Sequence, residues 1–129
     1  MENRCNHRRD LGRIGEDIAC DFLRSKGHTV VARNYRCGHL EIDIISRDDA
    51  GIHFVEVKCR QSGIQAPPQA SVDQTKQSRT ARAAGRFFRT EAGGRFAGEE
   101  CFFDIFAVTF DSERITTEWI PQAYIPIYM

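Results

Sequence analysis

Two strand-like segments joined by a short polar turn constrain the fold of this chain most strongly. Leu40 to Ser46 and Ile52 to Cys59 are rich in Ile, Val and Phe, and residues 47–51 between them combine two aspartates with a glycine. Runs of β-branched and aromatic residues on either side of such a turn predict a β-hairpin. Their high apolar content is typical of a sheet that is covered on both sides.

The segments around this hairpin predict helices and further strands. Apolar residues recur with helical spacing before Gly27, which is a typical helix stop, and Ser71 and Gln74 have the spacing of a capping box. In chain order, the expected elements are a helix, three strands, a helix and two strands, over residues 11–26, 29–35, 40–46, 52–59, 72–90, 101–110 and 115–120. This order predicts an α/β fold in which a mixed central sheet of about five strands is flanked by helices.

Length and composition favour a single domain. A chain of 129 residues has the usual size of one domain, so residues 1–129 are expected to form one, with residues 1–10 and 121–129 as extended or flexible ends. No apolar run approaches the roughly 20 residues that cross a bilayer, and the polar N-terminal residues do not resemble a secretory signal. We therefore expect a cytoplasmic protein with no membrane partner.

The cysteines and histidines show no metal-binding or disulfide pattern. The five cysteines are scattered and include no Cys-x-x-Cys pair, and the four histidines have no His-x-x-x-His spacing. A histidine without such a pattern is more often solvated or structural than a metal ligand. We expect neither a disulfide framework nor a zinc knuckle, and we assign no histidine to a metal.

Charged residues alternate with apolar ones in both strands of the hairpin. Side chains two apart in a strand share a face, so Glu41 and Asp43 are expected to project together. In the next strand, Glu56 and Lys58 share a face in the same way. The opposite faces are expected to carry Leu40, Ile42 and Ile44 in the first strand and His53, Val55 and Val57 in the second. Three carboxylates and one ammonium group would then meet on one face of the hairpin.

Such a cluster has a clear chemical use. Carboxylate oxygens, together with a backbone carbonyl and water, suit the octahedral coordination of Mg²⁺ or Mn²⁺. A lysine beside them would handle a proton or stabilise developing charge. The alternative is that these charged residues are solvent-facing positions of a half-exposed sheet.

The hairpin resembles the PD-(D/E)XK nuclease superfamily. Asp43 stands at the position of the first acid of that superfamily, and Glu56-Val57-Lys58 matches its (D/E)XK element. Glu16, in the first predicted helix, resembles the additional helical acid of several members, among them archaeal Holliday-junction resolvases. Ile42 stands where the superfamily motif has a proline before its first acid.

A larger set of residues resembles the uncharacterised YraN-like family. The resemblance runs from about Gly12 to Phe110, and it departs from the family pattern where Leu40, rather than glycine, precedes Glu41. The matching residues are Gly12, Gly15, Glu16, Ala19, Leu23, Gly27, Arg33 to Tyr35, Glu41 to Asp43, Phe54 to Lys58, Arg60, Lys76, Phe103 and Asp104.

The resemblance implies a restriction-endonuclease-like fold and a metal-dependent phosphodiesterase that acts on DNA, selecting structure rather than sequence. Asp43, Glu56 and the Val57 carbonyl would hold Mg²⁺ or Mn²⁺, and Glu16 would add a ligand or orient a water. Lys58 would orient or deprotonate that water and stabilise the transition state. Glu41 is a candidate auxiliary acid. The alternative is a non-catalytic nucleic-acid-binding module that acts through a repair or recombination partner.

The second predicted helix carries a basic face. The formal net charge of the chain is +0, yet its basic residues gather on this helix. At about 100° per residue, they fall on one broad arc, opposite an apolar arc. The basic arc consists of Lys76, Arg79, Arg82, Arg86 and Arg89. Arginine-rich faces suit phosphate, although an ordinary solvated face is the open alternative. DNA is the expected partner; an interaction domain without a nucleic-acid role would leave this face unexplained, and a homodimer stays open.

Overall fold

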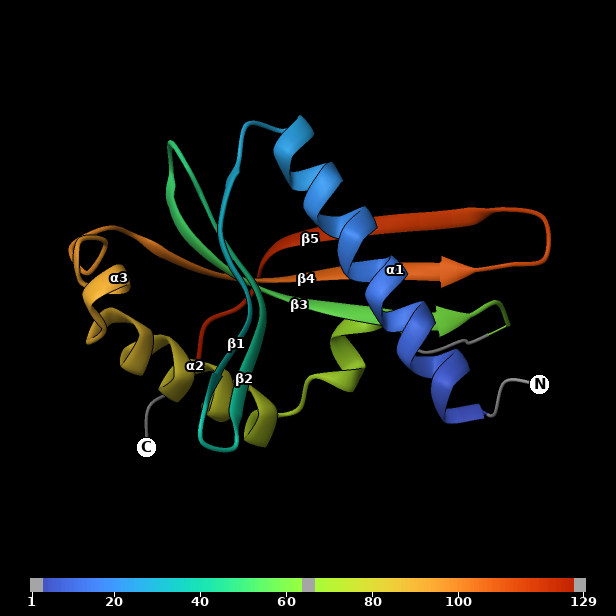
Figure 1. Cartoon of the computed structure of the whole chain (residues 1–129), viewed down its shortest axis with the longest axis horizontal. Coiled ribbons are helices and arrows are strands. Elements are labelled where there is room, and N and C mark those ends of the chain that lie inside the picture. The colour runs from blue at the N-terminus through green and yellow to red at the C-terminus, as the bar shows by residue number, and fades with distance from the viewer. Residues whose placement is uncertain (1–3, 64–66, 127–129) are drawn as a thin grey trace.

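The predicted hairpin lies within a five-stranded sheet whose strands lie in the order β1-β2-β3-β4-β5 (Figure 1). The structure is a computed structural model that describes residues 4–63 and 67–126. Its elements are α1 (Arg4–Ser25), β1 (Thr29–Cys37), β2 (Leu40–Asp48), β3 (Gly51–Gln61), the 3-10 turn η1 (Pro68–Ser71), α2 (Gln74–Phe88), α3 (Glu91–Gly94), β4 (Cys101–Phe110) and β5 (Ile115–Tyr124). The predicted mixed α/β fold and the predicted order of its main elements are confirmed.

The sheet is mixed because one pair of strands runs parallel. β1 pairs with β2, β2 with β3 and β4 with β5 in the antiparallel sense, whereas β3 and β4 are parallel. A parallel pair needs a crossover connection, and the segment that contains α2 provides it. The crossover places α2 against β2 on one face of the sheet, while α1 packs mainly against β3 on the other (Figure 1).

Two apolar clusters fill the space between the sheet and its helices. In the α2-side cluster, Phe54 packs with Phe87 of α2, and in the α1-side cluster, Val55 packs with Leu23 of α1. Phe54 and Val55 are consecutive in β3, so they point to opposite faces. The sheet is therefore covered on both sides, as its apolar strands indicate.

Helix α1 approaches β3 closely at one glycine. A side chain at Gly15 would collide with the sulfur of Cys59, so any other residue here would force Cys59 or the helix to move. The next residue, Glu16, is thereby held near the sheet. Among the described residues, no helix is long and apolar enough to cross a membrane.

Both ends of the described chain are more regular than predicted. Helix α1 begins at Arg4, whereas the sequence pattern predicts a helix only from residue 11, with an extended or flexible end before it. Apolar periodicity detects only the packed part of a helix, so it does not reveal a polar extension at the N-terminal end. β5 continues through Pro121 to Tyr124, which an edge strand tolerates because one of its sides needs no N–H donor. The rest of the predicted ends, residues 1–3 and 127–129, lies outside the described residues.

Helix α2 begins later than predicted and uses a different cap. Asp73 is its N-cap, and its carboxylate accepts a hydrogen bond from the Lys76 N–H at 2.9 Å. The predicted cap, Ser71, instead ends the short 3-10 turn. The cap fixes the first turn of α2, and with it the position of Lys76.

Candidate active site

Strands β2 and β3 part at Asp43. Their ladder runs from the turn to the pair Ile44–Val55 and ends there. Beyond it, the Val57 N–H donates to the Asp43 carboxylate at 2.9 Å, where a paired strand would offer a backbone carbonyl. The N–H and C=O of one strand residue project to the same edge, so the Val57 carbonyl faces this gap as well. Asp43 therefore lies between the two strands.

Alternation along β2 is interrupted at the same place. Leu40 and Ile42 pack in the α2-side cluster, and so does Ile45, but Ile44 packs in the α1-side cluster. The prediction that Ile44 projects with Leu40 and Ile42 is wrong. A strict two-residue period assumes a regular ladder on both sides of the strand, but the ladder with β3 ends at Ile44. On the β1 side, Asn34 lies between the pairs Arg33–Ile44 and Tyr35–Ile42 and has a positive φ of 52°.

Glu56 and Lys58 share the face of β3 opposite Val55 and Val57 of the α1-side cluster, as predicted, and this face is directed toward α2. The Glu56 oxygen Oε1 lies 3.1 Å from Lys58 Nζ and 2.7 Å from Lys76 Nζ. The other oxygen, Oε2, is buried and makes no hydrogen bond with a described residue. Glu56 thus pairs with two ammonium groups through one oxygen and leaves the other open to a further partner.

The two remaining candidate acids differ in burial. Glu16 projects from α1, and its buried Oε1 lies 3.6 Å from the Arg33 guanidinium without a hydrogen bond to any described residue. Arg33 donates instead to Asp17 at 2.8 Å. Glu41 is exposed and lies 3.9 Å from Arg36. Glu16 is therefore a half-buried acid whose buried Oε1 has no hydrogen-bond donor among the described residues, whereas Glu41 is a surface acid.

A cavity of about 290 Å³ opens beside the parted strands, and we call it the acidic cavity. Its lining consists of His39, Leu40, Glu41, Ile42, Asp43, Val55, Glu56, Lys76, Arg79 and Thr80. The structure brings three of the candidate acids and two basic-arc residues, Lys76 and Arg79, into this cavity. Glu16, Val57 and Lys58 are not part of its described lining and adjoin it through Asp43 and Glu56.

The surroundings of Asp43 disfavour the charged form of its carboxyl group. Burial raises its pKa to about 7, and the negative charges of Glu16, Glu56 and Glu41 add to the effect. The hydrogen bond from the Val57 N–H opposes it. Strongly perturbed acids in a cavity are typical of functional sites.

The pKa values of the two lysines beside Glu56 shift in opposite directions. Burial lowers the pKa of Lys58, and the neighbouring Lys76 adds to this effect against the attraction of Glu56. Burial also disfavours a charged Lys76, but its hydrogen bond to Glu56 helps to raise its pKa overall. Lys76 is therefore the firmer partner of Glu56, and Lys58 gives up a proton more readily.

Three of the candidate acids, all of them partly buried, do not converge on one point. Among the described residues, Glu16, Asp43 and Glu56 do not form a group whose ligand oxygens all lie within 4.8 Å of one another. The Val57 N–H donates to Asp43, whereas Glu16 lies 3.6 Å from the Arg33 guanidinium. Carboxylates repel each other, so an ion shared by these three groups would have to draw their oxygens closer together.

The predicted basic arc forms along α2 and its C-terminal end. Its four arginines are exposed and its lysine is half-buried: Arg79, Arg82, Arg86, Arg89 and Lys76. A hollow of about 440 Å³, lined by three of these arginines, lies between α2 and the turn that joins β1 to β2. It shares His39, Leu40 and Arg79 with the acidic cavity. The basic surface therefore leads into the acidic cavity.

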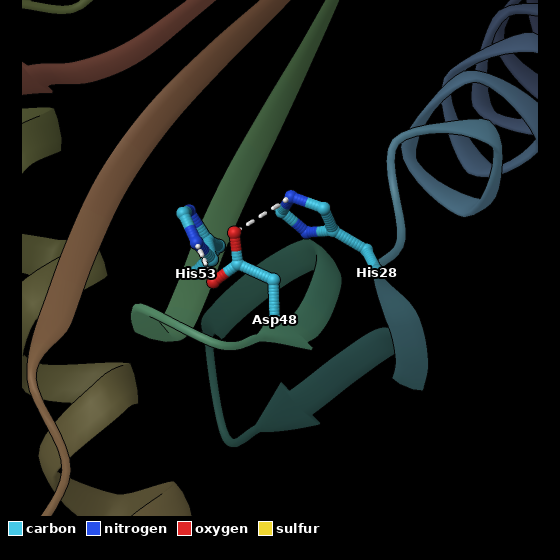
Figure 2. Close-up of side chains that lie close together, drawn as sticks. All are labelled: His28, Asp48 and His53. Atoms are coloured by element: carbon cyan, nitrogen blue, oxygen red, sulfur yellow. Dashed lines mark hydrogen bonds and ion pairs between the residues drawn. The ribbon is translucent and has the colours of Figure 1, made fainter.

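A second cluster of polar side chains lies at the turn end of the β2–β3 hairpin. His28 follows α1, Asp48 ends β2, and His53 stands near the start of β3. Figure 2 shows the Asp48 carboxylate between the two imidazole rings. Within the described part of the chain, these three form the only group of potential ligands whose atoms all lie within 4.8 Å of one another. No sequence pattern joins them, because only the fold brings their three elements together.

The two histidines of this cluster have opposite pKa shifts. Burial lowers the pKa of His28, and the neighbouring His53 adds to the effect. Burial also disfavours a charged His53, but hydrogen bonds to Asp104 and Asp48 outweigh burial and raise its pKa. His53 is therefore the more easily protonated of the two rings.

Comparison with known proteins assigns the chain to a family. The profile of "Uncharacterised protein family UPF0102" matches residues 15–108. A UPF0102 protein of Geobacter metallireducens is 36% identical over 118 residues, which cover 92% of this chain and 94% of the relative. A UPF0102 protein of Moorella thermoacetica is 39% identical over 107 residues, covering 83% of this chain and 87% of the relative. One from Solibacter usitatus is 50% identical over 80 residues, covering 60% and 61%.

The match includes the whole of the candidate site. Residues 15–108 contain the acidic cavity, Glu16, Lys58 and the basic arc. The range also matches most of the span, from about 12 to 110, over which the sequence resembles the YraN-like family. The chain therefore belongs to the uncharacterised protein family UPF0102, and its YraN-like resemblance is confirmed.

Proposed function

We propose that this protein is a metal-dependent nuclease of the PD-(D/E)XK type that cleaves DNA and selects its substrate by structure rather than by sequence. The observation that supports this most is the position of Asp43, which lies where β2 and β3 part, in one cavity with Glu56. A paired hairpin would use its carbonyls in a ladder, whereas parted strands direct the Val57 carbonyl and Asp43 into the same gap. The mixed α/β fold agrees with a restriction-endonuclease-like protein.

The acidic groups suit a hard divalent cation. The Glu16 oxygen Oε1 and the Glu56 oxygen Oε2 are buried without a hydrogen bond to a described residue. Such oxygens are unfavourable unless a donor or a cation reaches them. Asp43, Glu56 and the Val57 carbonyl would hold Mg²⁺ or Mn²⁺, with Glu16 as a further ligand or as the residue that orients a water. When bound, the ion would neutralise phosphate charge and lower the pKa of water.

Lys58 would act on the attacking water. Its Nζ lies 3.1 Å from Glu56, and burial lowers its pKa. A lysine with a lowered pKa exchanges a proton more readily near neutral pH, and its charged form stabilises the negative charge that develops on the phosphoryl oxygens. Lys76, the firmer partner of Glu56, would keep that carboxylate in place. Glu41 would serve as an auxiliary acid at the exposed rim.

The basic arc of α2 would bind the DNA backbone. Guanidinium groups contact phosphate in a bidentate manner, and neutralisation of the backbone gives affinity that does not depend on sequence. The hollow lined by Arg79, Arg82 and Arg86 adjoins the acidic cavity, so a strand bound along it would pass near Asp43. This arrangement supports recognition of DNA shape rather than of base edges.

A second candidate function is that of a nucleic-acid-binding module without catalysis, which acts through a repair or recombination partner. The ion pairs of Glu56 with Lys58 and Lys76 favour it, because they balance this carboxylate without a metal. Both candidates use the basic arc. They differ in whether DNA is cleaved.

A cleavage assay separates the two candidates. Single-stranded, flapped, branched and duplex DNA are incubated with the protein in Mg²⁺, Mn²⁺ or EDTA. We expect metal-dependent cleavage that favours flapped or branched DNA and is lost in Asp43→Asn and Glu56→Gln. Glu118→Gln, which changes an exposed carboxylate on β5, is the matched control and should cleave like the wild type. Salt-sensitive DNA binding without cleavage of any form would instead support the binding module.

A further inference from the structure

We infer that the turn end of the β2–β3 hairpin binds a divalent transition-metal ion of the Zn²⁺ type through His28, Asp48 and His53 (Figure 2). This site would be separate from the acidic cavity. Asp48 ends β2, whereas Asp43 lies near its middle, and the rise of a strand places them roughly 16 Å apart. His53 also lies on the face of the sheet opposite Glu56, by the alternation of β3.

The three ligand side chains already face one another. His28 Nε2 lies 3.4 Å from Asp48 Oδ2, and His53 Nε2 lies 2.9 Å from Asp48 Oδ1. The first distance is long for a hydrogen bond, but it matches the separation of about 3.3 Å between two ligands of a tetrahedral ion with bonds of about 2.0 to 2.1 Å. The cluster therefore needs only small side-chain movements to admit an ion.

The far nitrogen of each imidazole is also held. His53 Nδ1 lies 2.7 Å from Asp104 Oδ2, and His28 Nδ1 lies 2.9 Å from the Ser46 hydroxyl. Histidines that bind metals regularly donate their second N–H to a carboxylate or another acceptor, which fixes the ring and leaves Nε2 free for the ion. Both rings are thus oriented as such ligands are.

Asp104 is itself fixed from several sides. It is fully buried, and it accepts the Gln122 N–H at 2.9 Å and the Trp119 indole N–H at 3.3 Å in addition to its contact with His53. Gln122 has a positive φ of 49° and lies where the register between β4 and β5 shifts. Positive φ is uncommon outside glycine, so an irregularity of β5 supplies one of these donors. The orientation of His53 is therefore built into the sheet.

The surroundings suit an ion site with one open side. The side chains of His28 and His53 are 1% and 5% exposed, whereas that of Asp48 is 25% exposed. His28 packs against Trp119 with 5.4 Å between ring centroids, and His53 stacks on Phe102 at 4.8 Å. An ion would enter past Asp48, and water would complete its coordination from the same side.

The type of ligand distinguishes this site from the acidic cavity. Imidazole nitrogen suits Zn²⁺ and related transition metals, whereas Mg²⁺ prefers oxygen ligands in octahedral geometry. The proposed Mg²⁺ or Mn²⁺ ligands in the acidic cavity are oxygens only. An ion at the turn end would join the α1–β1 junction, the β2–β3 turn and β3, so it would stabilise the fold.

Zn²⁺ titration calorimetry tests the inference. Untagged protein is stripped of metal and titrated with Zn²⁺ in excess Mg²⁺, which occupies oxygen sites. We expect one Zn²⁺ per chain and a higher melting temperature. X-ray absorption of the complex should show nitrogen and oxygen ligands at about 2.0 to 2.1 Å and no sulfur at about 2.3 Å.

Substitutions locate the bound ion. His28→Gln and Asp48→Asn should each weaken Zn²⁺ binding by about tenfold or more, and the nearly isosteric Asp48→Asn covers the case in which His28→Gln does not fold. Asp21→Asn, which changes an exposed carboxylate on α1, is the matched control for Asp48→Asn and should bind like the wild type. Three results would overturn the site: no binding, Zn²⁺ held by sulfur, or wild-type affinity in both folded ligand variants. Each of these outcomes is independent of whether DNA is cleaved.

Discussion

At the two ends of the β2–β3 hairpin, the pKa values of two aspartates shift in opposite directions. At the turn end, burial disfavours the charge on Asp48, but hydrogen bonds and attraction from His53 outweigh burial and its pKa is lowered. Asp104, fully buried nearby, accepts from three donors. At the other end, where β2 and β3 part at Asp43, burial and neighbouring acids raise the pKa of Asp43 to about 7, although the Val57 N–H donates to it. We call this the parted end.

The difference lies in the donors that the fold supplies. Asp43 and Asp48 belong to the same strand, so their residue type and strand context do not explain it. A carboxylate surrounded by donors stabilises the fold, whereas one that lies near other acids favours a cation or a proton. The turn end is therefore expected to be important for stability, and the parted end for chemistry.

The largest effect on stability is expected at the turn end. Asp104→Ala removes the acceptor of His53, Gln122 and Trp119, and should lower the free energy of unfolding by about 3 to 5 kcal/mol in urea denaturation. The control Asp21→Ala removes an exposed carboxylate 3.7 Å from Arg24 and should change stability by less than about 0.5 kcal/mol. Similar losses of stability in the two variants would contradict the claim that the turn end is important for stability.

The largest effect on cleavage is expected at the parted end. Lys58→Ala should lower the single-turnover rate by about two orders of magnitude or more, because it removes transition-state stabilisation while Asp43 and Glu56 remain to bind metal. DNA affinity should change little. Glu56→Ala should lose both metal binding and cleavage, and Lys26→Ala, on the exposed surface, is the control. A Lys58→Ala protein that cuts as fast as the wild type would rule out this role.

A smaller effect is expected along α2. Replacing Arg79, Arg82 and Arg86 by Ala should weaken binding to all DNA sequences about equally, by about tenfold or more, and reduce the dependence of affinity on salt. Fluorescence anisotropy over a range of salt concentrations measures both. The matched control replaces three exposed arginines elsewhere, Arg13, Arg24 and Arg114. Equal losses in the two triple variants would show that total charge, rather than the basic arc, sets affinity.

The smallest expected effect is a gain in stability on substitution of Asp43. Asp43→Asn should raise the free energy of unfolding of the metal-free protein at pH 8 by about 1 kcal/mol, because it removes a buried negative charge beside Glu16 and Glu56. The asparagine oxygen can still accept from Val57. Glu118→Gln, at an exposed position of β5, should leave stability unchanged in the same denaturation experiment. A destabilised Asp43→Asn protein would mean that Asp43 is as well satisfied as Asp104.

Local patterns were sufficient to predict that three charged residues of the β2–β3 hairpin lie near one another. Asp43, Glu56 and Lys58 belong to two strands joined by a short turn, so predicting the hairpin also predicts that they lie near one another. The orientation of Ile44 was not predictable in the same way, because strict alternation assumes that the ladder continues. Glu16 was expected only from the resemblance, since its approach to the sheet depends on the packing of Gly15 against β3.

The turn end could not be predicted from local patterns. His28, Asp48 and His53 come from different elements, and Asp104 reaches them only because β4 lies parallel to β3. The cap of α2 was missed for a related reason. Ser71 has the right spacing for a capping box, but the 3-10 turn that precedes α2 places Asp73 at the cap instead.

Anomalous diffraction from crystals soaked in Mn²⁺ tests most directly whether the parted end is a metal-dependent active site. We expect a Mn²⁺ ion within coordination distance of Asp43 and Glu56, with the Val57 carbonyl facing it and Glu56 moved away from at least one of its two lysines. The contradictory result is a soaked crystal without Mn²⁺ in the acidic cavity, in which Asp43 still accepts from Val57 and Glu56 still pairs with Lys58 and Lys76.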